Sequence, residues 1–180
     1  TFGVLDDNCN SGYGENYFCN QSDTWRWDGV TWNRVADENS GGYGQPYPNN
    51  GSECAMAYDK DMGETIMIGN GNTWVWSGTA WTQKENSNSY SVSGQVAYDE
   101  ERALVMAFGG YGIYEFIAPG SDGGVTPNRV WNEVIPGASE SADGGVINLG
   151  RMDHAMAYDP ISKRVIVFGG ESSGGNQSCN

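Results

Sequence analysis

Residues 55–59 read Ala-Met-Ala-Tyr-Asp, and this segment returns as Gln-Val-Ala-Tyr-Asp at 95–99 and as Ala-Met-Ala-Tyr-Asp at 155–159. Each copy predicts a short apolar strand that ends at an aspartate, a residue type favoured in turns. A segment that recurs in this way is the mark of a repeat architecture. The repeat therefore indicates the fold before any single strand is assigned.

A second segment follows each copy within a few residues. It reads Glu-Thr-Ile-Met-Ile-Gly-Asn at 64–70, Ala-Leu-Val-Met-Ala-Phe-Gly-Gly at 103–110 and Arg-Val-Ile-Val-Phe-Gly-Gly at 164–170. Nearly continuous apolar runs rich in β-branched residues are typical of strands buried on both faces. The polar turns before them have hairpin length, so the two segments predict the same β-hairpin three times.

A third segment carries tryptophans at fixed offsets. Asp-Thr-Trp-Arg-Trp-Asp-Gly-Val-Thr-Trp at 23–32 matches Asn-Thr-Trp-Val-Trp-Ser-Gly-Thr-Ala-Trp at 72–81, so Trp25 and Trp74 are 49 residues apart. The pattern predicts a strand, a tight Asp-Gly or Ser-Gly turn and a second strand.

The last copy of the third segment is degraded. Tyr114 and Phe116 replace the first two tryptophans, and a Gly-rich insertion at 117–128 postpones the final aromatic residue to Trp131. We expect this insertion to form a surface loop on one rim of the fold.

Four strands per repeat, a glycine doublet after the second strand and aromatic residues at fixed offsets resemble the kelch repeat, over roughly residues 23–170. The resemblance implies an all-β fold, a β-propeller of four-stranded antiparallel blades around a central channel. The repeat positions that carry it are Trp25, Trp32, Tyr58, Trp74, Trp81, Tyr98, Gly109, Gly110, Trp131, Tyr158, Gly169 and Gly170, whereas Gly69-Asn70 departs from the glycine doublet.

The need to bury both faces of each four-stranded blade also favours a stack of blades. One blade of about 50 residues has two faces to cover and must stack against neighbouring blades. We expect the glycine doublets to permit positive φ and close backbone approach, and the aromatic side chains to fill the space between blades. Aromatic side chains exposed on a rim would instead stack on sugars or contact a partner.

We expect residues 1–180 to form a single propeller domain or part of one. The ring of blades that this sequence predicts is incomplete. Blade material covers 53–84 and 95–134, and residues 23–35 together with 150–170 would form one further blade. About three blades result, whereas closed propellers have four to eight. Two interpretations stay open: the chain is part of a longer propeller, or half-blades of neighbouring copies complete a six-bladed ring or a filament.

The composition narrows the range of partners. Asp and Glu number 23 against nine Lys and Arg, giving a net charge of −14 that repels nucleic-acid phosphates. No stretch approaches the roughly 20 apolar residues that span a bilayer. The sequence shows no secretory signal pattern, so we expect a mature secreted chain or part of a longer one.

The cysteines point to an extracellular or cell-surface location, and three sequons would matter only where the source glycosylates. One histidine and no paired Cys-x-x-Cys motif argue against zinc, so disulfides are expected, with Cys9–Cys19 as the preferred local pair among three open pairings. The disulfide candidates are Cys9, Cys19, Cys54 and Cys179, and the candidate N-glycosylation sites are Asn20, Asn50 and Asn176.

No catalytic constellation emerges, and we expect the chain not to be an enzyme. His154 is the single histidine, so it is expected to be structural or channel-lining, and it cannot supply the two-histidine copper site of kelch-bearing oxidases. The six arginines are scattered, without the cluster of a sialidase pocket. No cofactor is assigned. Ca²⁺ at Asp6-Asp7-Asn8, Asp59-Lys60-Asp61 or Asp122-Gly123-Gly124 is the alternative, although hairpin turns select such residues anyway.

These observations predict a protein-binding or assembly scaffold. Its partner would be another protein or other copies of the chain, met by the loops at 8–22, 36–52 and 117–128. The alternative is a carbohydrate-binding or carbohydrate-active propeller, for which a glycan would be the partner.

Overall fold

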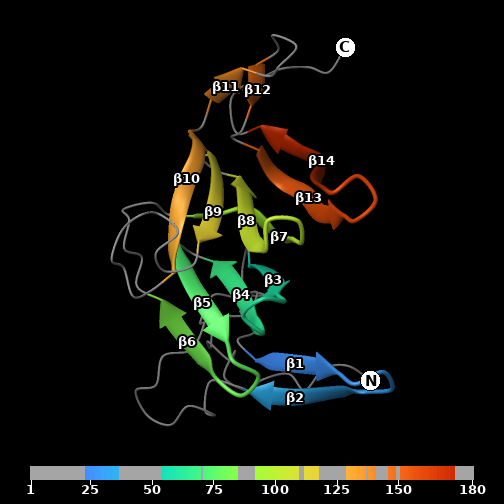
Figure 1. Cartoon of the computed structure of the whole chain (residues 1–180). Coiled ribbons are helices and arrows are strands. Elements are labelled where there is room, and N and C mark those ends of the chain that lie inside the picture. The colour runs from blue at the N-terminus through green and yellow to red at the C-terminus, as the bar shows by residue number, and fades with distance from the viewer. Residues whose placement is uncertain are drawn as a thin grey trace, which may run out of the picture.

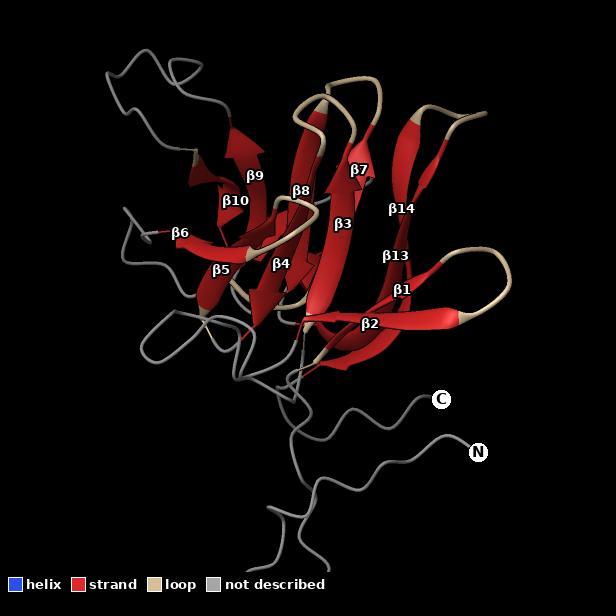
Figure 2. Ribbon diagram, turned by 90° about the horizontal axis from the view of Figure 1, so that it is seen from below, coloured by secondary structure: helices blue, strands red, loops and turns tan. Residues whose placement is uncertain are grey.

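The computed structural model describes residues 23–36, 54–69, 71–84, 92–109, 112–117, 129–136, 138–140, 146–148 and 151–172. Regular structure in these ranges is β-strand throughout, and they contain no helix (Figure 2). The all-β prediction is therefore confirmed.

The strands follow one another at short intervals. Their bounds are β1 (Thr24–Trp27), β2 (Trp32–Ala36), β3 (Ala55–Asp59), β4 (Glu64–Gly69), β5 (Asn72–Trp76), β6 (Trp81–Lys84), β7 (Gln95–Asp99), β8 (Leu104–Gly109), β9 (Gly112–Ile117), β10 (Val130–Pro136), β11 (Ala138–Glu140), β12 (Val146–Asn148), β13 (Arg151–Asp159) and β14 (Arg164–Ser172).

Two sheets have four strands each, in sequential antiparallel order. The first sheet is β3-β4-β5-β6 and the second sheet is β7-β8-β9-β10. The strands β1 and β2 form a separate N-terminal hairpin, and β13 and β14 form a separate C-terminal hairpin. A small hairpin, β11–β12, was not predicted, because it lies outside the repeat. Four-stranded antiparallel sheets are thus confirmed.

The repeat recurs in the pairing register. In β3–β4, β7–β8 and β13–β14, the last pair before the turn joins the repeat aspartate to the first residue of the next strand: Asp59 to Glu64, Asp99 to Leu104 and Asp159 to Arg164. Equal registers mean that residues at equal offsets from these aspartates occupy equivalent places.

Strands at the start of each unit lie next to one another. The strand β7 contacts both β3 and β13, so the first sheet, the second sheet and the C-terminal hairpin form a row. The N-terminal and C-terminal hairpins lie at opposite ends of this row, with both four-stranded sheets between them (Figure 1). No described strand of one hairpin pairs with the other.

All three aspartate turns share one backbone path. The Asp59 Oδ1 atom accepts the amides of Asp61 and Met62 at 3.0 Å each, and Asp99 and Asp159 accept the amides at the same two offsets. The residue before the next strand then has positive φ in each turn: Gly63 (69°), Ala103 (53°) and Lys163 (55°). Two of the three turns thus place a side chain where glycine is preferred.

We expect Ala103→Gly to stabilise the fold by roughly 0.5–1 kcal/mol, because relief of left-handed strain exceeds the added entropy of the unfolded chain. Gly63→Ala should destabilise it by about 1 kcal/mol. The expected loss of stability in Gly63→Ala does not come from a steric clash, because an added Cβ would meet only the Tyr58 hydroxyl at 4.0 Å. Urea unfolding monitored by tryptophan fluorescence measures both values, and equal signs for the two variants would contradict the assignment.

Candidate binding surfaces at the two ends of the row

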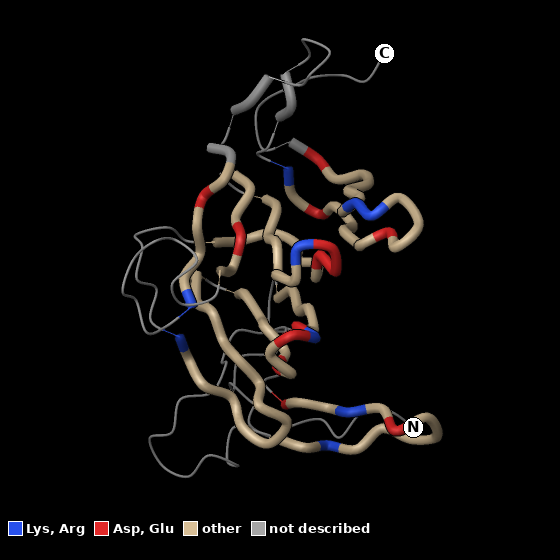
Figure 3. The backbone as a smooth tube through the Cα atoms, in the orientation of Figure 1, with Lys and Arg blue, Asp and Glu red and all other residues tan. Residues whose placement is uncertain are grey.

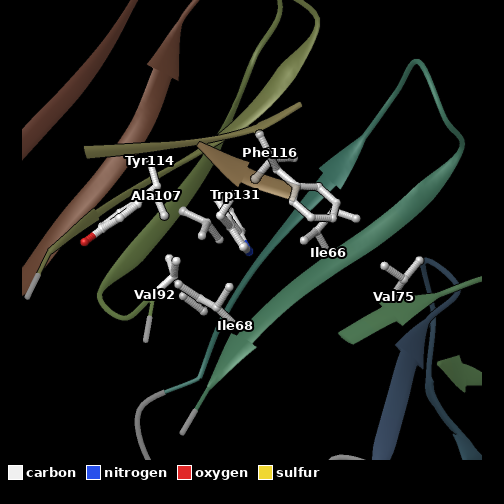
Figure 4. Close-up of a cluster of buried hydrophobic side chains, with 11 residues drawn as sticks. Ile66, Ile68, Val75, Val92, Ala107, Tyr114, Phe116 and Trp131 are labelled. Carbon is white, nitrogen blue, oxygen red and sulfur yellow. The ribbon is translucent and has the colours of Figure 1, made fainter. Parts of the chain in front are cut away.

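The main core is the contact between the first and second sheets. Ile66, Ile68 and Val75 of the first sheet belong to one buried cluster with Val105, Ala107, Tyr114, Phe116 and Trp131 of the second. Figure 4 shows Ile66 and Ile68 close to Phe116 and Trp131. We call each four-stranded sheet and each terminal hairpin a unit. The forward face of a unit is turned toward the next unit along the chain, and the backward face is the opposite one.

A cross-strand aromatic pair occupies the backward face of each unit that contains the third segment. The ring centroids are 5.5 Å apart for Trp27–Trp32, 5.4 Å for Trp76–Trp81 and 4.9 Å for Phe116–Trp131. These pairs occupy the same register positions in β1–β2, β5–β6 and β9–β10.

The third tryptophan of the segment binds the preceding unit. The Trp131 indole Nε1 donates to Thr73 Oγ1 at 2.8 Å, and Trp81 Nε1 donates to Thr24 Oγ1 at the same distance. Thr24 and Thr73 are equivalent and point away from the aromatic pairs of their own units. One hydrogen bond therefore links the N-terminal hairpin to the first sheet and the first sheet to the second.

A buried ion pair adds to the junction between the first and second sheets. The Arg129 guanidinium binds the carboxylate of Asp59 across the two sheets and lies over the Phe116 ring, 5.5 Å from its centroid. Asp59 is fully buried, and its other oxygen caps the turn. The position equivalent to Arg129 holds Val30 in the N-terminal hairpin and Thr79 in the first sheet, so the repeat carries no signal for this contact.

The aspartate turns are also linked to one another. The strand β7, which carries Tyr98, contacts β3, and burial and then the carboxylates of Asp59 and Asp61 raise the pKa of the Tyr98 phenol. Two surface ion pairs, Lys60–Glu100 and Lys163–Glu101, join neighbouring turns. Figure 3 shows acidic and basic residues close together there. Exposed pairs of this kind add little free energy but favour a common alignment.

The junction between the second sheet and the C-terminal hairpin contains the single histidine. His154 is buried and meets the Phe108 ring edge-on, with centroids 5.0 Å apart. Burial lowers the pKa of this imidazole. His154 therefore packs between the second sheet and the C-terminal hairpin, as a structural residue would.

The backward face of the N-terminal hairpin has no neighbour among the described residues. Trp25, Trp27 and Trp32 lie on it, each with 49% of its surface exposed, although Tyr114, Phe116 and Trp131 at the equivalent positions of the second sheet are buried. These three tryptophans form what we call the N-end face.

The forward face of the C-terminal hairpin is open in the same way. Ile166 is 49% exposed and Phe168 79%, whereas the equivalent Ile66 and Ile68 are 0% and 1% exposed. Ala155 and Ala157, which pair with Phe168 and Ile166, are also exposed. These four residues form the C-end face. The prediction that the second segment is buried on both faces holds for β4 but is wrong for β14.

The flank of β3 is a third open surface. Met56 and Tyr58 on the backward face of the first sheet are more than half exposed. The equivalent Val96 is buried, and Tyr98 and Tyr158 are partly covered by the preceding unit. The N-terminal hairpin supplies no strand at this place, because it contains the counterparts of β5 and β6 only.

The predicted repeat residues thus divide by location. Trp74, Trp131 and the partly buried Trp81, Tyr98 and Tyr158 lie at junctions, while Trp25, Trp32 and Tyr58 are exposed. Gly109, Gly169 and Gly170 have positive φ, and a Cβ on Gly170 would lie 2.5 Å from the Met152 carbonyl oxygen. The expected close approach is confirmed there.

Other predicted positions fall outside the described residues. These are Gly110, Cys9, Cys19, Cys179, Asn20, Asn50 and Asn176, and also the loops at 8–22, 36–52 and 117–128 apart from the border residues Ala36 and Ile117. Cys54 immediately precedes β3 and faces Gly69. The disulfide and glycosylation assignments therefore stay predictions.

Within the described ranges, no group of three or more His, Cys, Asp or Glu side chains is arranged to hold a metal ion. A search of the same ranges for helices finds none of the length and apolarity needed to cross a membrane. No protein-family model matches the chain, and neither does any curated protein or solved structure.

The sequence analysis missed Thr24, Thr73 and Arg129. A signal existed for the threonines, since each immediately precedes the first tryptophan of its segment and they are 49 residues apart. Their role depends on a tryptophan of the next unit, which a single segment does not reveal.

We expect Thr73→Val to destabilise the protein by about 1–3 kcal/mol, because it leaves the buried Trp131 indole N–H without an acceptor while keeping the side-chain shape. Thr24→Val is the matched control and should cost about 1 kcal/mol or less, since Trp81 is only partly buried and can bind water. Free energies of unfolding in urea measure both. A larger loss for Thr24→Val would contradict this account.

Proposed function

We propose that the chain is a kelch-like β-propeller module, secreted or displayed at the cell surface, that acts as a protein-binding or assembly scaffold through its N-end and C-end faces. Each four-stranded sheet is a blade in this proposal, and each terminal hairpin is half of one. The two hairpins bind β-rich partners that supply the missing strands and cover the open faces.

One observation carries the proposal: the end faces expose the residue positions that the two sheets bury against each other. Ile166 and Phe168 correspond to the buried Ile66 and Ile68, and the exposed Trp27 corresponds to Phe116. Apolar side chains gathered on one face, next to an unpaired strand edge, mark an interaction site. Among the described strands, β1 pairs only with β2 and β14 only with β13, so the other edge of each can accept a partner strand by β-augmentation.

The extracellular assignment rests on the sequence. Four cysteines without a zinc pattern and three sequons in polar segments support an oxidising, glycosylating compartment. The net charge of −14 supports solubility and disfavours nucleic acid as a partner.

Substituting Phe168→Asp or Trp27→Asp should abolish complex formation in the native host, because either change buries a charge in the proposed contact. Tagged variants are expressed there, and cross-linked complexes are compared by native mass. Ile161→Asp and Thr82→Asp are the controls, since Ile161 is 93% exposed in the turn of the C-terminal hairpin and Thr82 is exposed on β6 of the first sheet, away from both end faces. If all four variants form the complexes of the wild-type chain, the end faces are not binding surfaces.

Carbohydrate binding is a second candidate, favoured by the three half-exposed tryptophans of the N-end face. Trp27 and Trp32 present paired aromatic rings inclined at 49°, a surface on which a sugar ring can stack. The acidic charge of the chain favours neutral sugars over anionic ones.

Isothermal titration with a panel of neutral hexose oligosaccharides tests this candidate. Binding by the wild-type chain should weaken at least tenfold in Trp27→Ala and remain unchanged in Val30→Ala, because loss of an aromatic stacking surface costs upwards of 1.4 kcal/mol. No heat signal with any oligosaccharide at millimolar concentration would remove carbohydrate binding from consideration.

A further inference from the structure

We infer that the partner of the end faces is a second copy of this chain, whose β14 pairs antiparallel with β1 and joins the two hairpins into one four-stranded sheet. This inference rests on the proposed function and specifies the partner. Two copies joined at both ends form a closed pair with six four-stranded sheets: two complete sheets in each copy and two composite sheets.

Each hairpin supplies the strands that the other lacks. The N-terminal hairpin corresponds in register and aromatic pairing to β5–β6 and β9–β10, and the C-terminal hairpin corresponds to β3–β4 and β7–β8. Placed side by side as β13-β14-β1-β2, they reproduce the strand order of both complete sheets.

The two complete sheets fix the register of the composite sheet. Ile66 lies opposite Val75, and Met106 lies opposite Glu115, so Ile166 of one copy lies opposite Arg26 of the other. By the same rule Val167 lies opposite Trp25, and Phe168 opposite Thr24. A charged residue is tolerated at the Arg26 position, because the second sheet has Glu115 there.

The faces also match. In the composite sheet, Trp25, Trp27 and Trp32 stand where the second sheet has Tyr114, Phe116 and Trp131, and they pack on the forward face of the second sheet of the other copy. Ile166 and Phe168 turn toward the backward face of the first sheet, which already binds the N-terminal hairpin through Trp81 and Thr24. Both contacts repeat the face-to-face packing of the observed core.

The exposed flank of β3 supports the same partner. In the row, β3 lies beside β7, and β7 lies beside β13. A β13 strand from the second copy would lie beside β3 in the same way and would cover Met56 and Tyr58. One docking event therefore covers the N-end face, the C-end face and this flank, a coincidence that an unrelated partner does not explain.

The contact is head-to-tail, because the two surfaces that meet differ. Such a contact propagates unless the rotation closes. Two copies contribute six sheets, within the four to eight that propellers use. We therefore assign the closed pair, and not a filament, as the product.

Light scattering after size exclusion tests the pair. The purified chain at 10–100 µM should have about twice its own mass of 19.4 kDa. Phe168→Asp should weaken pairing by roughly 100-fold, since it removes a buried phenylalanine and adds a charge, whereas Ile161→Asp should leave the mass unchanged. Circular dichroism confirms that each variant is folded. A monomer at 100 µM, or a polymer, overturns the closed pair.

Disulfide trapping tests the register. Arg26→Cys in one preparation is mixed with Ile166→Cys in another, so that only different chains can be linked between these positions. Opposite residues on neighbouring strands have Cα atoms about 5 Å apart, within reach of a disulfide. Mass spectrometry should find the peptide containing position 26 linked to that containing position 166.

The matched control replaces Arg26→Cys by Asn33→Cys. Asn33 lies opposite Arg26 on the same face but one strand farther from β14, about 10 Å away, and should give no link to position 166. A link at 33 and not at 26 overturns the register.

The outcomes separate this inference from the proposed function. If the purified chain stays monomeric while Phe168→Asp still abolishes complexes in the native host, the end faces bind a different partner and the second copy is ruled out. If neither experiment responds to Phe168→Asp, both proposals fall.

Discussion

The structure depends on one constraint: an antiparallel sheet of four short strands has two faces, and the apolar side chains of each face need a neighbour to shield them from water. A helix covers one face of a sheet in many folds, but the described part of this chain has no helix. The faces must then cover each other, forward against backward, as Ile66 and Ile68 do against Phe116 and Trp131. The row of sheets, the repeat that produces it and the exposure at its two ends all follow from this arrangement.

The contacts that hold the row together are of two kinds. Some belong to the repeat, such as the aspartate that caps each turn and the tryptophan that donates to a threonine of the preceding unit. Others occur once, such as Arg129 with Asp59 and His154 against Phe108. The repeated contacts set the geometry of every junction. The single contacts make the junctions chemically distinct, so neighbouring units are not interchangeable.

An open row has a consequence for function. Both ends of the described row expose aromatic and aliphatic side chains, next to edges of β1 and β14 that pair with no other described strand. In repeat proteins such ends are normally capped by polar units, because they otherwise associate. Here the end units keep the apolar residue types of the interior repeats, and Trp27, Ile166 and Phe168 are exposed.

The sequence by itself determined the strands of the repeat and their order. The Ala-Tyr-Asp segments, the apolar runs after them and the aromatic pairs are local patterns, and their periodicity follows from backbone geometry that does not need the rest of the chain. Only the tertiary structure decided which faces are buried. Phe108 and Phe168 have nearly the same neighbours in sequence, yet one packs on His154 and the other is 79% exposed, because burial depends on whether another unit follows in space. The Asp59 partner of Arg129 was undecided because this ion pair occurs once and no recurring spacing marks it. The Trp–Thr bonds recur at separations of 57 and 58 residues, but only the packing of one unit on the next shows that these residues meet.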